Sequence, residues 1–323
     1  MNIINATRAD TGGQGIRLST AINETFPGIH TSRAFTGGLN YGKIPYDILY
    51  QKKWKDKGFP DEVMDLWKAA DVYHLHHSKG WMKHWPLREM NPKAGVIMHI
   101  HGRPNAKRRR AMIREVEETR NYIRVVSTPC LLYLVKDNPY RWFPHPIDFP
   151  QLEKFRKENK KDDGIFRVIH APTVNKDTKT FLEVMKYIER RYKNVETIVI
   201  HHQPQVRAWE LKSVGDIHFN ALHHGMGGNI FECMVMNIPS ITGDWGRRYP
   251  KTIKQMHPTN TMPFVRALTK GTLYNAVEKL ILSSSLREEV ITAGSLWVEK
   301  YHTFEYTAKH AIKTYEEAIA LRS

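Results

Sequence analysis

The fold of this chain is decided by the stretch His223-His224-Gly225-Met226-Gly227-Gly228-Asn229-Ile230-Phe231-Glu232-Cys233-Met234-Val235-Met236-Asn237-Ile238-Pro239-Ser240. Three glycines within four positions allow a ligand to approach the backbone closely, because glycine has no Cβ. The apolar run that follows predicts a helix whose first N–H groups point back at the glycines and favour a phosphate. Glu232 lies about one turn into that helix, where its carboxylate could reach a ribose hydroxyl.

The spacing Gly-x-Gly-x-x-x-x-Glu-x-x-x-x-x-x-Pro, from Gly225 to Pro239, resembles the nucleotide-sugar site of GT-B glycosyltransferases, in particular the large retaining family four. That family usually has two glutamates separated by seven residues. Glu232 corresponds to the second glutamate, and His224 stands at the position of the first. The resemblance implies that Glu232 binds the ribose and that His224 lies near the transferred sugar as a catalytic residue. The resemblance also implies donor contacts from Gly225, Gly227, Gly228 and Asn229.

The composition fits a soluble protein with an unusually basic charge. At 323 residues the chain is long enough for two domains. Its net charge is +16, and residues 1–150 carry 23 basic against 14 acidic side chains, so the excess is not confined to a tail. Such a charge favours polyanionic partners, namely nucleic acid, anionic lipid or acidic glycans, although a basic protein need not bind any of them. Two cysteines, no signal peptide and no long apolar run predict a cytoplasmic protein.

The first half of the chain predicts a Rossmann-like domain. A strand at 2–6 leads through Gly13 and Gly15, which are candidate donor-phosphate contacts, into a helix. We expect residues 36–60 to be irregular and a helix to run from 61 to 70, with Asp61 as its cap. Two apolar strands follow, at 71–75 and 96–100. The second ends in His101-Gly102, which resembles the histidine of the family's active site and makes His101 a candidate catalytic residue.

Histidines near the first of these strands raise the alternative of a metal site. Strand alternation places His74 and His76 on one face and His77 on the other, and no carboxylate or cysteine lies at ligand spacing. The sequence also has no Asp-x-Asp motif. We therefore predict that the protein needs no metal.

A basic helix is predicted over residues 105–124. Its first turns are crowded with positive charge, which opposes the helix dipole and favours an anionic ligand, although a solvated charged face would look the same. The candidate residues for binding an acceptor or nucleic acid are Arg103, Lys107, Arg108, Arg109 and Arg110. A strand is expected at 124–128, and a charged connector at 151–164.

The second half repeats the α/β pattern. We expect strands at 166–170, 197–201, 217–219 and 240–244, and helices at 180–191, 272–281, 284–296 and 297–321. His170-Ala171-Pro172, followed by Lys176 and Lys179 in a loop at 171–179, resembles the family segment that holds the donor diphosphate. The resemblance implies that both lysines bind the donor and that Lys179 supports the leaving group.

Together these features predict an α/β protein with the GT-B fold, two Rossmann-like domains facing a central cleft. We expect an acceptor domain at 1–150, a donor domain at 151–300 and a helix at 301–323 crossing back to the first domain. The predicted function is transfer of a sugar from a nucleotide sugar, expected to be a UDP-sugar, to a hydroxyl group. In overall character the chain resembles phage enzymes that glucosylate hydroxymethylated bases in DNA. The alternatives are an envelope polysaccharide or glycolipid glycosyltransferase, and a nucleic-acid-binding protein on a non-catalytic scaffold.

Overall fold

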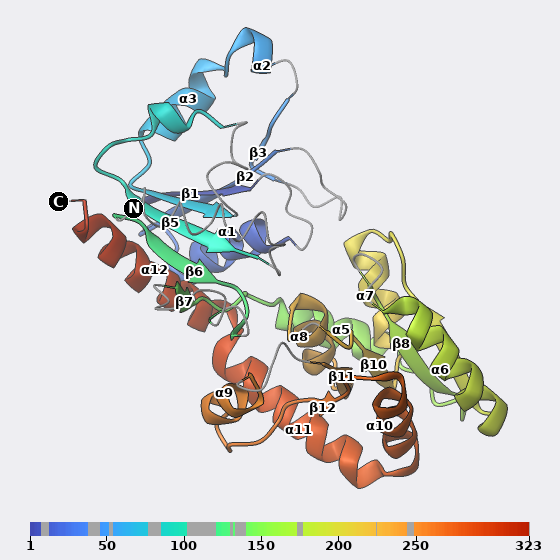
Figure 1. Cartoon of the computed structure of the whole chain (residues 1–323). Helices are drawn as coiled ribbons and strands as arrows, with labels where there is room; N and C mark the ends of the chain where they lie inside the picture. The colour runs from blue at the N-terminus through green and yellow to red at the C-terminus, as the bar shows by residue number, and fades with distance from the viewer. Residues whose placement is uncertain are drawn as a thin grey trace. The chain divides into compact units, whose positions relative to one another are not determined.

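The computed structural model describes residues 1–7, 13–37, 46–51, 54–76, 85–101, 121–129, 132, 140–172, 177–223, 225–243 and 249–322. Contacts divide the chain into two compact units (Figure 1). The first unit contains Met1–Pro146 and Phe304–Ser323, and the second contains Ile147–Thr303. No helix in the described part of the chain is long and apolar enough to cross a membrane.

The first unit is built on a seven-stranded parallel sheet with the order β3-β2-β1-β4-β5-β6-β7. The strands are β1 Asn2–Thr7, β2 Thr31–Thr36, β3 Ile48–Leu49, β4 Val72–His76, β5 Gly95–Ile100, β6 Ile123–Val126 and β7 Tyr140–Trp142. The helical elements are α1 Gln14–Thr25, α2 Trp54–Lys57, α3 Asp61–Lys68, the 3₁₀ helix η2 Leu87–Glu89 and α12 Phe304–Ala320. The strand order reverses between β1 and β4, and in such sheets ligands bind outside the carboxyl ends of the strands at that point.

The last helix, α12, completes the first unit, although it comes from the other end of the sequence. Its apolar side chains share a buried cluster with α1 and with the strands, including Ile22, Ile97 and Tyr315. Gly95 permits a close approach between β5 and α12, since a Cβ there would lie only 2.8 Å from the backbone nitrogen of Ile319. A second cluster, which includes Trp67, also buries apolar side chains of this sheet.

The second unit is built on a five-stranded parallel sheet with the order β12-β11-β10-β8-β9. The strands are β8 Phe166–His170, β9 Val195–Val199, β10 Ile217–Phe219, β11 Ser240–Thr242 and β12 Val265–Arg266. The helices are α5 Phe149–Asn159, α6 Thr178–Arg191, α7 Gln205–Ser213, α8 Gly228–Val235, α9 Tyr249–Met256, α10 Lys270–Leu282 and α11 Ser284–Tyr301. Here the strand order reverses between β8 and β10.

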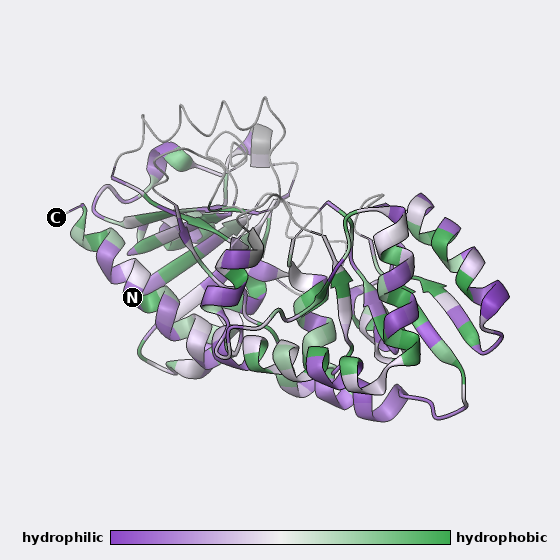
Figure 2. Ribbon diagram, turned by 60° about the horizontal axis from the view of Figure 1, so that its bottom comes forward, coloured by the Kyte–Doolittle hydropathy of each residue, from purple (hydrophilic) through white to green (hydrophobic). Residues whose placement is uncertain are grey.

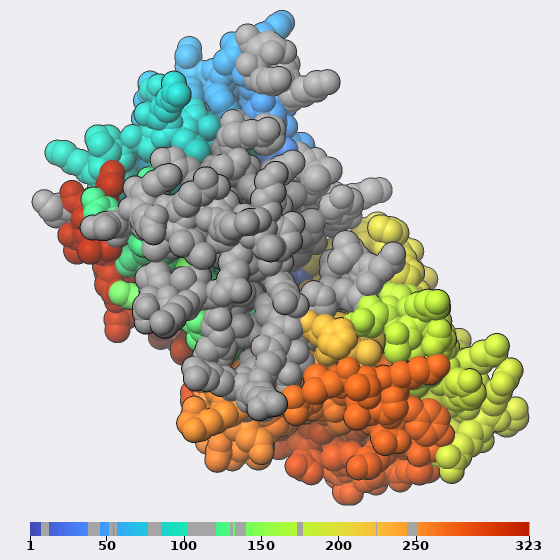
Figure 3. Space-filling view, viewed as in Figure 1, coloured from blue at the N-terminus to red at the C-terminus, as the bar shows by residue number. Residues whose placement is uncertain are grey.

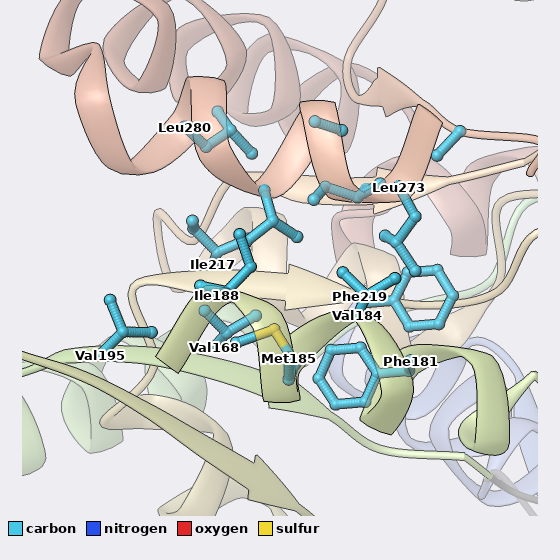
Figure 4. Close-up of a cluster of buried hydrophobic side chains, with 14 of the residues drawn as sticks. Val168, Phe181, Val184, Met185, Ile188, Val195, Ile217, Phe219, Leu273 and Leu280 are labelled. Atoms are coloured by element: carbon cyan, nitrogen blue, oxygen red, sulfur yellow. The ribbon is translucent and has the colours of Figure 1, made fainter. Parts of the chain in front are cut away.

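The core of the second unit lies between its sheet and the helices α6 and α10. Side chains of α6 and α10, such as Phe181 and Leu273, point toward Val168 and Phe219 of the strands (Figure 4). Hydrophobic residues are concentrated in the two sheets, whereas the helices carry hydrophilic residues on part of their surface (Figure 2). Residues of α6 and α10 form part of the outer surface of this unit (Figure 3).

Several boundaries differ from those predicted from the sequence. The stretch 36–60, expected to be irregular, contains β3 and α2, and Pro60 rather than Asp61 precedes α3. The expected connector at 151–164 is largely helical, because α5 covers Phe149–Asn159. Residues 121–124, expected to end a helix, form a turn and the start of β6. The last two helices meet at 302–303 rather than at 296–297.

Candidate functional site

The candidate site lies where the strand order of the second sheet reverses, at the carboxyl ends of β8 and β10. His170 and Phe219 are the last residues of these strands and are neighbours in the ladder. His170 is fully buried, and its Nδ1 lies 2.9 Å from the Phe219 carbonyl, to which it must donate. Its Nε2 then accepts from the hydroxyl of Thr178, 3.0 Å away at the start of α6. This histidine therefore connects both strand ends to α6.

Three further hydrogen bonds hold the loops that follow these strands. Asp177 has a left-handed backbone (φ 59°), and its carboxylate accepts a hydrogen bond of 2.8 Å from the backbone nitrogen of Leu222. The Asn220 amide donates to the Gly225 carbonyl at 3.2 Å and to Thr242 Oγ1 at 3.1 Å. The loop that leads from β10 to α8 is thus held by Asp177, which precedes α6, and by Asn220 within the loop itself.

Helix α8 begins at the predicted glycine loop. Gly227 precedes the helix, and no side chain of the described residues caps it. The first hydrogen bonds of the helix run from the backbone nitrogens of Ile230 and Phe231 to the Gly227 carbonyl. The N–H groups of Gly228 and Asn229 have no acceptor inside the helix, as at any helix start. This end of α8 is therefore suited to an anion.

Within the described part of the chain, neither backbone conformation nor packing requires a glycine at position 227 or 228. Gly227 has φ −154°, which any residue adopts. Among the described residues, nothing lies within 4 Å of a Cβ built on Gly227 or Gly228. Gly243, at the end of β11, is a contrast, since a Cβ there would lie 1.6 Å from the Leu222 carbonyl oxygen. Open space in front of Gly227 and Gly228 is what a ligand close to the backbone requires.

The carboxylate of Glu232 is held inside the second unit by a lysine. Lys212 of α7 places its Nζ 2.5 Å from Glu232 Oε2 and 2.7 Å from Asn229 Oδ1. The two charged side chains are only 3% and 7% exposed. The Asn229 amide in turn donates to the Ala171 carbonyl at 2.6 Å. One chain of polar contacts therefore joins α7, α8 and the segment after β8.

Sequence reasoning missed Lys212, as it did Asp177, Thr178 and Asn220. Lys212 sits near the end of α7, and the buried residues of that helix are Trp209, Lys212 and Ser213. The sequence offers no clear signal for it, because the apolar residues of α7 do not form a distinct stripe along the helix. The partner of Lys212, Glu232, is twenty residues further along the chain.

The structure describes only some of the other residues that were predicted to bind the donor. Lys179 is exposed and lies in the first turn of α6, which begins at Thr178, so the prediction that it belongs to a loop is wrong. Gly13 precedes α1 with a left-handed backbone (φ 63°), and Gly15 is buried within that helix. Lys176 and His224 lie outside the described residues. So do the predicted acceptor residues Arg103, Lys107, Arg108, Arg109 and Arg110.

His101 follows β5 in the first unit and takes part in a group of histidines. Its Nδ1 lies 2.6 Å from Ser127 Oγ, and its Nε2 lies 2.8 Å from His76 Nδ1. His74 and His76 stack with their ring centroids 4.5 Å apart, on one face of β4 as strand alternation predicts. His74 is completely buried, and this burial lowers its pKa from 6.5 to about 3, so its ring is neutral.

Solved structures resemble the whole chain, although the sequences are distant. A glycosyltransferase from Rickettsia africae is 11% identical, with 98% of each chain covered and a TM-score of 0.64. Anabaena Alr3699/HepE in complex with UDP and glucose is 10% identical, with 97% of this chain and 99% of that chain covered and a TM-score of 0.66. The catalytic domain of starch synthase IV from Arabidopsis thaliana, bound to ADP and acarbose, is 8% identical, with 99% of each chain covered and a TM-score of 0.60.

The likeness shows the fold, and it confirms the predicted GT-B class with two parallel α/β sheets. No protein-family model matches the sequence. No curated protein matches it either.

Proposed function

We propose that the protein is a glycosyltransferase that takes a sugar from a nucleotide-sugar donor, with the donor bound in the second unit at the start of α8. The observation that carries this proposal is that Gly227 and Gly228, which meet no described neighbour at their Cβ positions, stand at the start of the helix that also holds the fixed carboxylate of Glu232. The glycines and the helix start suit the diphosphate, and Glu232 suits the ribose hydroxyls. The complexes of similar structures with UDP or ADP support a nucleoside diphosphate.

Sugar transfer requires this site to stabilise the negative charge that develops on the leaving diphosphate as the glycosidic bond breaks. The N–H groups at the start of α8 can supply part of that stabilisation without reorganising. Lys179 lies in the first turn of α6, next to Thr178. The hydroxyl of Thr178 forms a hydrogen bond with His170 at the end of β8. We propose that the exposed ammonium group of Lys179, together with Lys176, supports the diphosphate. His224 and His101 stay proposals for the sugar side of the reaction.

Gly228→Ala is a better test of the donor site than any change of Glu232. Replacing Glu232 would leave Lys212 buried without its carboxylate, so loss of binding and loss of stability would be mixed. A methyl group at position 228 meets no described neighbour within 4 Å, so the variant should fold with an unchanged melting temperature. It should weaken UDP binding about tenfold or more, a change of about 1.4 kcal/mol, because the methyl occupies the space proposed for the diphosphate.

The matched control is Gly271→Ala. Gly271 is also a glycine in the first turn of a helix, α10, and nothing in the described structure lies within 4 Å of its Cβ position. Isothermal titration with UDP and with UDP-sugars should give wild-type affinity for this control. Equal UDP affinity in Gly228→Ala, Gly271→Ala and wild type would refute the placement of the diphosphate at α8.

For the acceptor we propose a 5-hydroxymethylated pyrimidine in DNA. The net charge of +16 supports this proposal, because a basic protein attracts the phosphates of DNA. DNA binding should weaken as salt rises, with a slope in log[salt] of about −0.9 per phosphate contact on duplex. Replacing Arg108, Arg109 and Arg110 with alanine should reduce that slope while leaving donor binding intact. Mass spectrometry of nucleosides from treated hydroxymethylated DNA decides the question, and an unmodified digest across several UDP-sugars would refute a DNA acceptor.

A further inference from the structure

Five histidines gather at the carboxyl edge of the first sheet. They come from three parts of the chain that are distant in sequence: His74 and His76 from β4, His99 and His101 from β5 and the residue after it, and His145 from the segment after β7. All are buried except His101, which is half-buried. The rings of His99 and His101 stack at 4.1 Å, and that of His145 lies 5.9 Å and 5.5 Å from them.

We propose that His99, His101 and His145 form a binding site for a divalent transition metal, with Zn²⁺ as the expected ion. Such a site would replace the expectation from the sequence that no metal is needed, and it would make His101 a metal ligand in place of its proposed role beside the sugar. One ring nitrogen of each lies within 4.8 Å of a ring nitrogen of the other two. Three imidazoles are a ligand set that binds Zn²⁺ with one further position open. His101 is the half-buried member, so that the open position and the entry path lie on its side.

The hydrogen bonds of His101 direct one nitrogen to the metal. Ser127 Oγ donates to the Ile100 carbonyl at 3.0 Å, so it accepts the 2.6 Å bond from His101 Nδ1–H. In the neutral ring the lone pair then lies on Nε2. This nitrogen lies 2.8 Å from His76 Nδ1, and metal binding would replace that contact. A ligating histidine whose other nitrogen is held by an oxygen is the usual arrangement in metal sites.

The hydrogen bonds of His99 can be assigned in the same way. Its Nδ1 lies 2.9 Å from His74 Nε2, and His74 Nδ1 lies 2.7 Å from the hydroxyl of Tyr315 on α12. If His99 binds a metal through Nε2, its Nδ1–H donates to His74, and His74 Nδ1–H donates to Tyr315. The rings of His99 and His74 are then both neutral, which agrees with the complete burial of His74. The network therefore supplies a second oriented ligand without a buried charge.

Tetrahedral coordination at about 2.0–2.1 Å requires ligand nitrogens about 3.4 Å apart. The planes of the three rings lie within 29° of one another, and a metal lies in the plane of each ring that binds it, so the rings must turn toward one point as well as close inward. His145 can supply most of this movement, because it lies in the irregular segment 143–148 rather than in a strand. No carboxylate or thiolate belongs to the described group of metal-ligating side chains, which favours Zn²⁺ or Co²⁺ over Mg²⁺ and Ca²⁺.

The test uses the full chain without an affinity tag, stripped with a chelator and titrated with Co²⁺ as a spectroscopic probe. The expected result is one Co²⁺ per chain with the intense visible bands of a tetrahedral nitrogen site, displaced by Zn²⁺, and a melting temperature raised by either ion. His145→Ala and His101→Ala should each weaken Co²⁺ binding at least tenfold. His101→Ala keeps the test decisive if His145→Ala does not fold, because position 101 is half-buried.

The matched control replaces His201 and His202, two adjacent exposed histidines of the second unit, with alanine. This variant should bind Co²⁺ as the wild type does. The proposal is overturned if the wild type shows no tetrahedral spectrum, if the spectrum persists in both His101→Ala and His145→Ala, or if it is lost in the His201/His202 control.

Discussion

The buried ion pair between Lys212 and Glu232 gives the sharpest prediction about stability. Lys212→Met removes the ammonium group but keeps most of the volume of the side chain. Unit charges 2.5 Å apart attract by about 7 kcal/mol at an effective dielectric constant of about 20, before the desolvation of both groups is counted. Desolvation offsets much of that attraction in the native pair, but the variant leaves the carboxylate buried without the positive charge of Lys212. We expect the free energy of unfolding to fall by about 3–5 kcal/mol.

Removing both charges should cost less than removing one. The double variant Lys212→Met/Glu232→Leu places two apolar side chains in a site where the charged groups are 3% and 7% exposed. Replacing a buried pair with apolar residues of similar volume is often close to neutral. We therefore expect most of the loss seen in Lys212→Met to be recovered, and a coupling energy of about 2 kcal/mol or more in the double-mutant cycle.

Urea unfolding followed by circular dichroism measures these differences. Lys279→Met is the matched control, because Lys279 is an exposed lysine in the last turn of α10, and its replacement should change stability by no more than about 0.5 kcal/mol. A loss below about 1 kcal/mol in Lys212→Met would refute the reasoning. So would a double variant whose loss equals the sum of the two single losses, since the charges would then not depend on each other.

Three further predictions concern packing and reactivity. Gly243→Ala should destabilise the protein by about 3 kcal/mol or prevent folding, as measured by thermal unfolding, because its Cβ would lie 1.6 Å from the Leu222 carbonyl oxygen. Gly95→Ala should lower the melting temperature by pushing α12 away from β5, and a wild-type value would contradict the close approach seen there. In a Cys130→Ser background, the Cys233 thiol should not react with a disulfide reagent at pH 8 unless the protein is unfolded, because burial raises its pKa to about 12; rapid modification of the folded protein would contradict this.

The sequence predicted most of the α/β order, because hydrophobic periodicity reports contacts between residues close in the chain. The strands β4, β5, β8 and β10 and the helix α8 with Gly227 before it lie where the pattern places them. The short elements β3 and α2 within 36–60 were missed, because two or four residues are too few to show a period. The longer elements β2, α7 and α9 were not predicted either. The helix α5 was hidden by its charged residues, since only Leu152 is buried within it.

The sequence by itself determined the loop at 225–228, the carboxylate at 232 and the basic charge, because each can be read from neighbouring residues or from composition. Only the tertiary structure decided what surrounds them. Lys212 reaches Glu232 because α7 and α8 pack in the same unit, and β4, β5 and the segment after β7 bring five histidines together because of the strand order. Strand order and helix packing are set by the burial of apolar surface over the whole chain, so contacts between distant polar side chains leave no local pattern in the sequence.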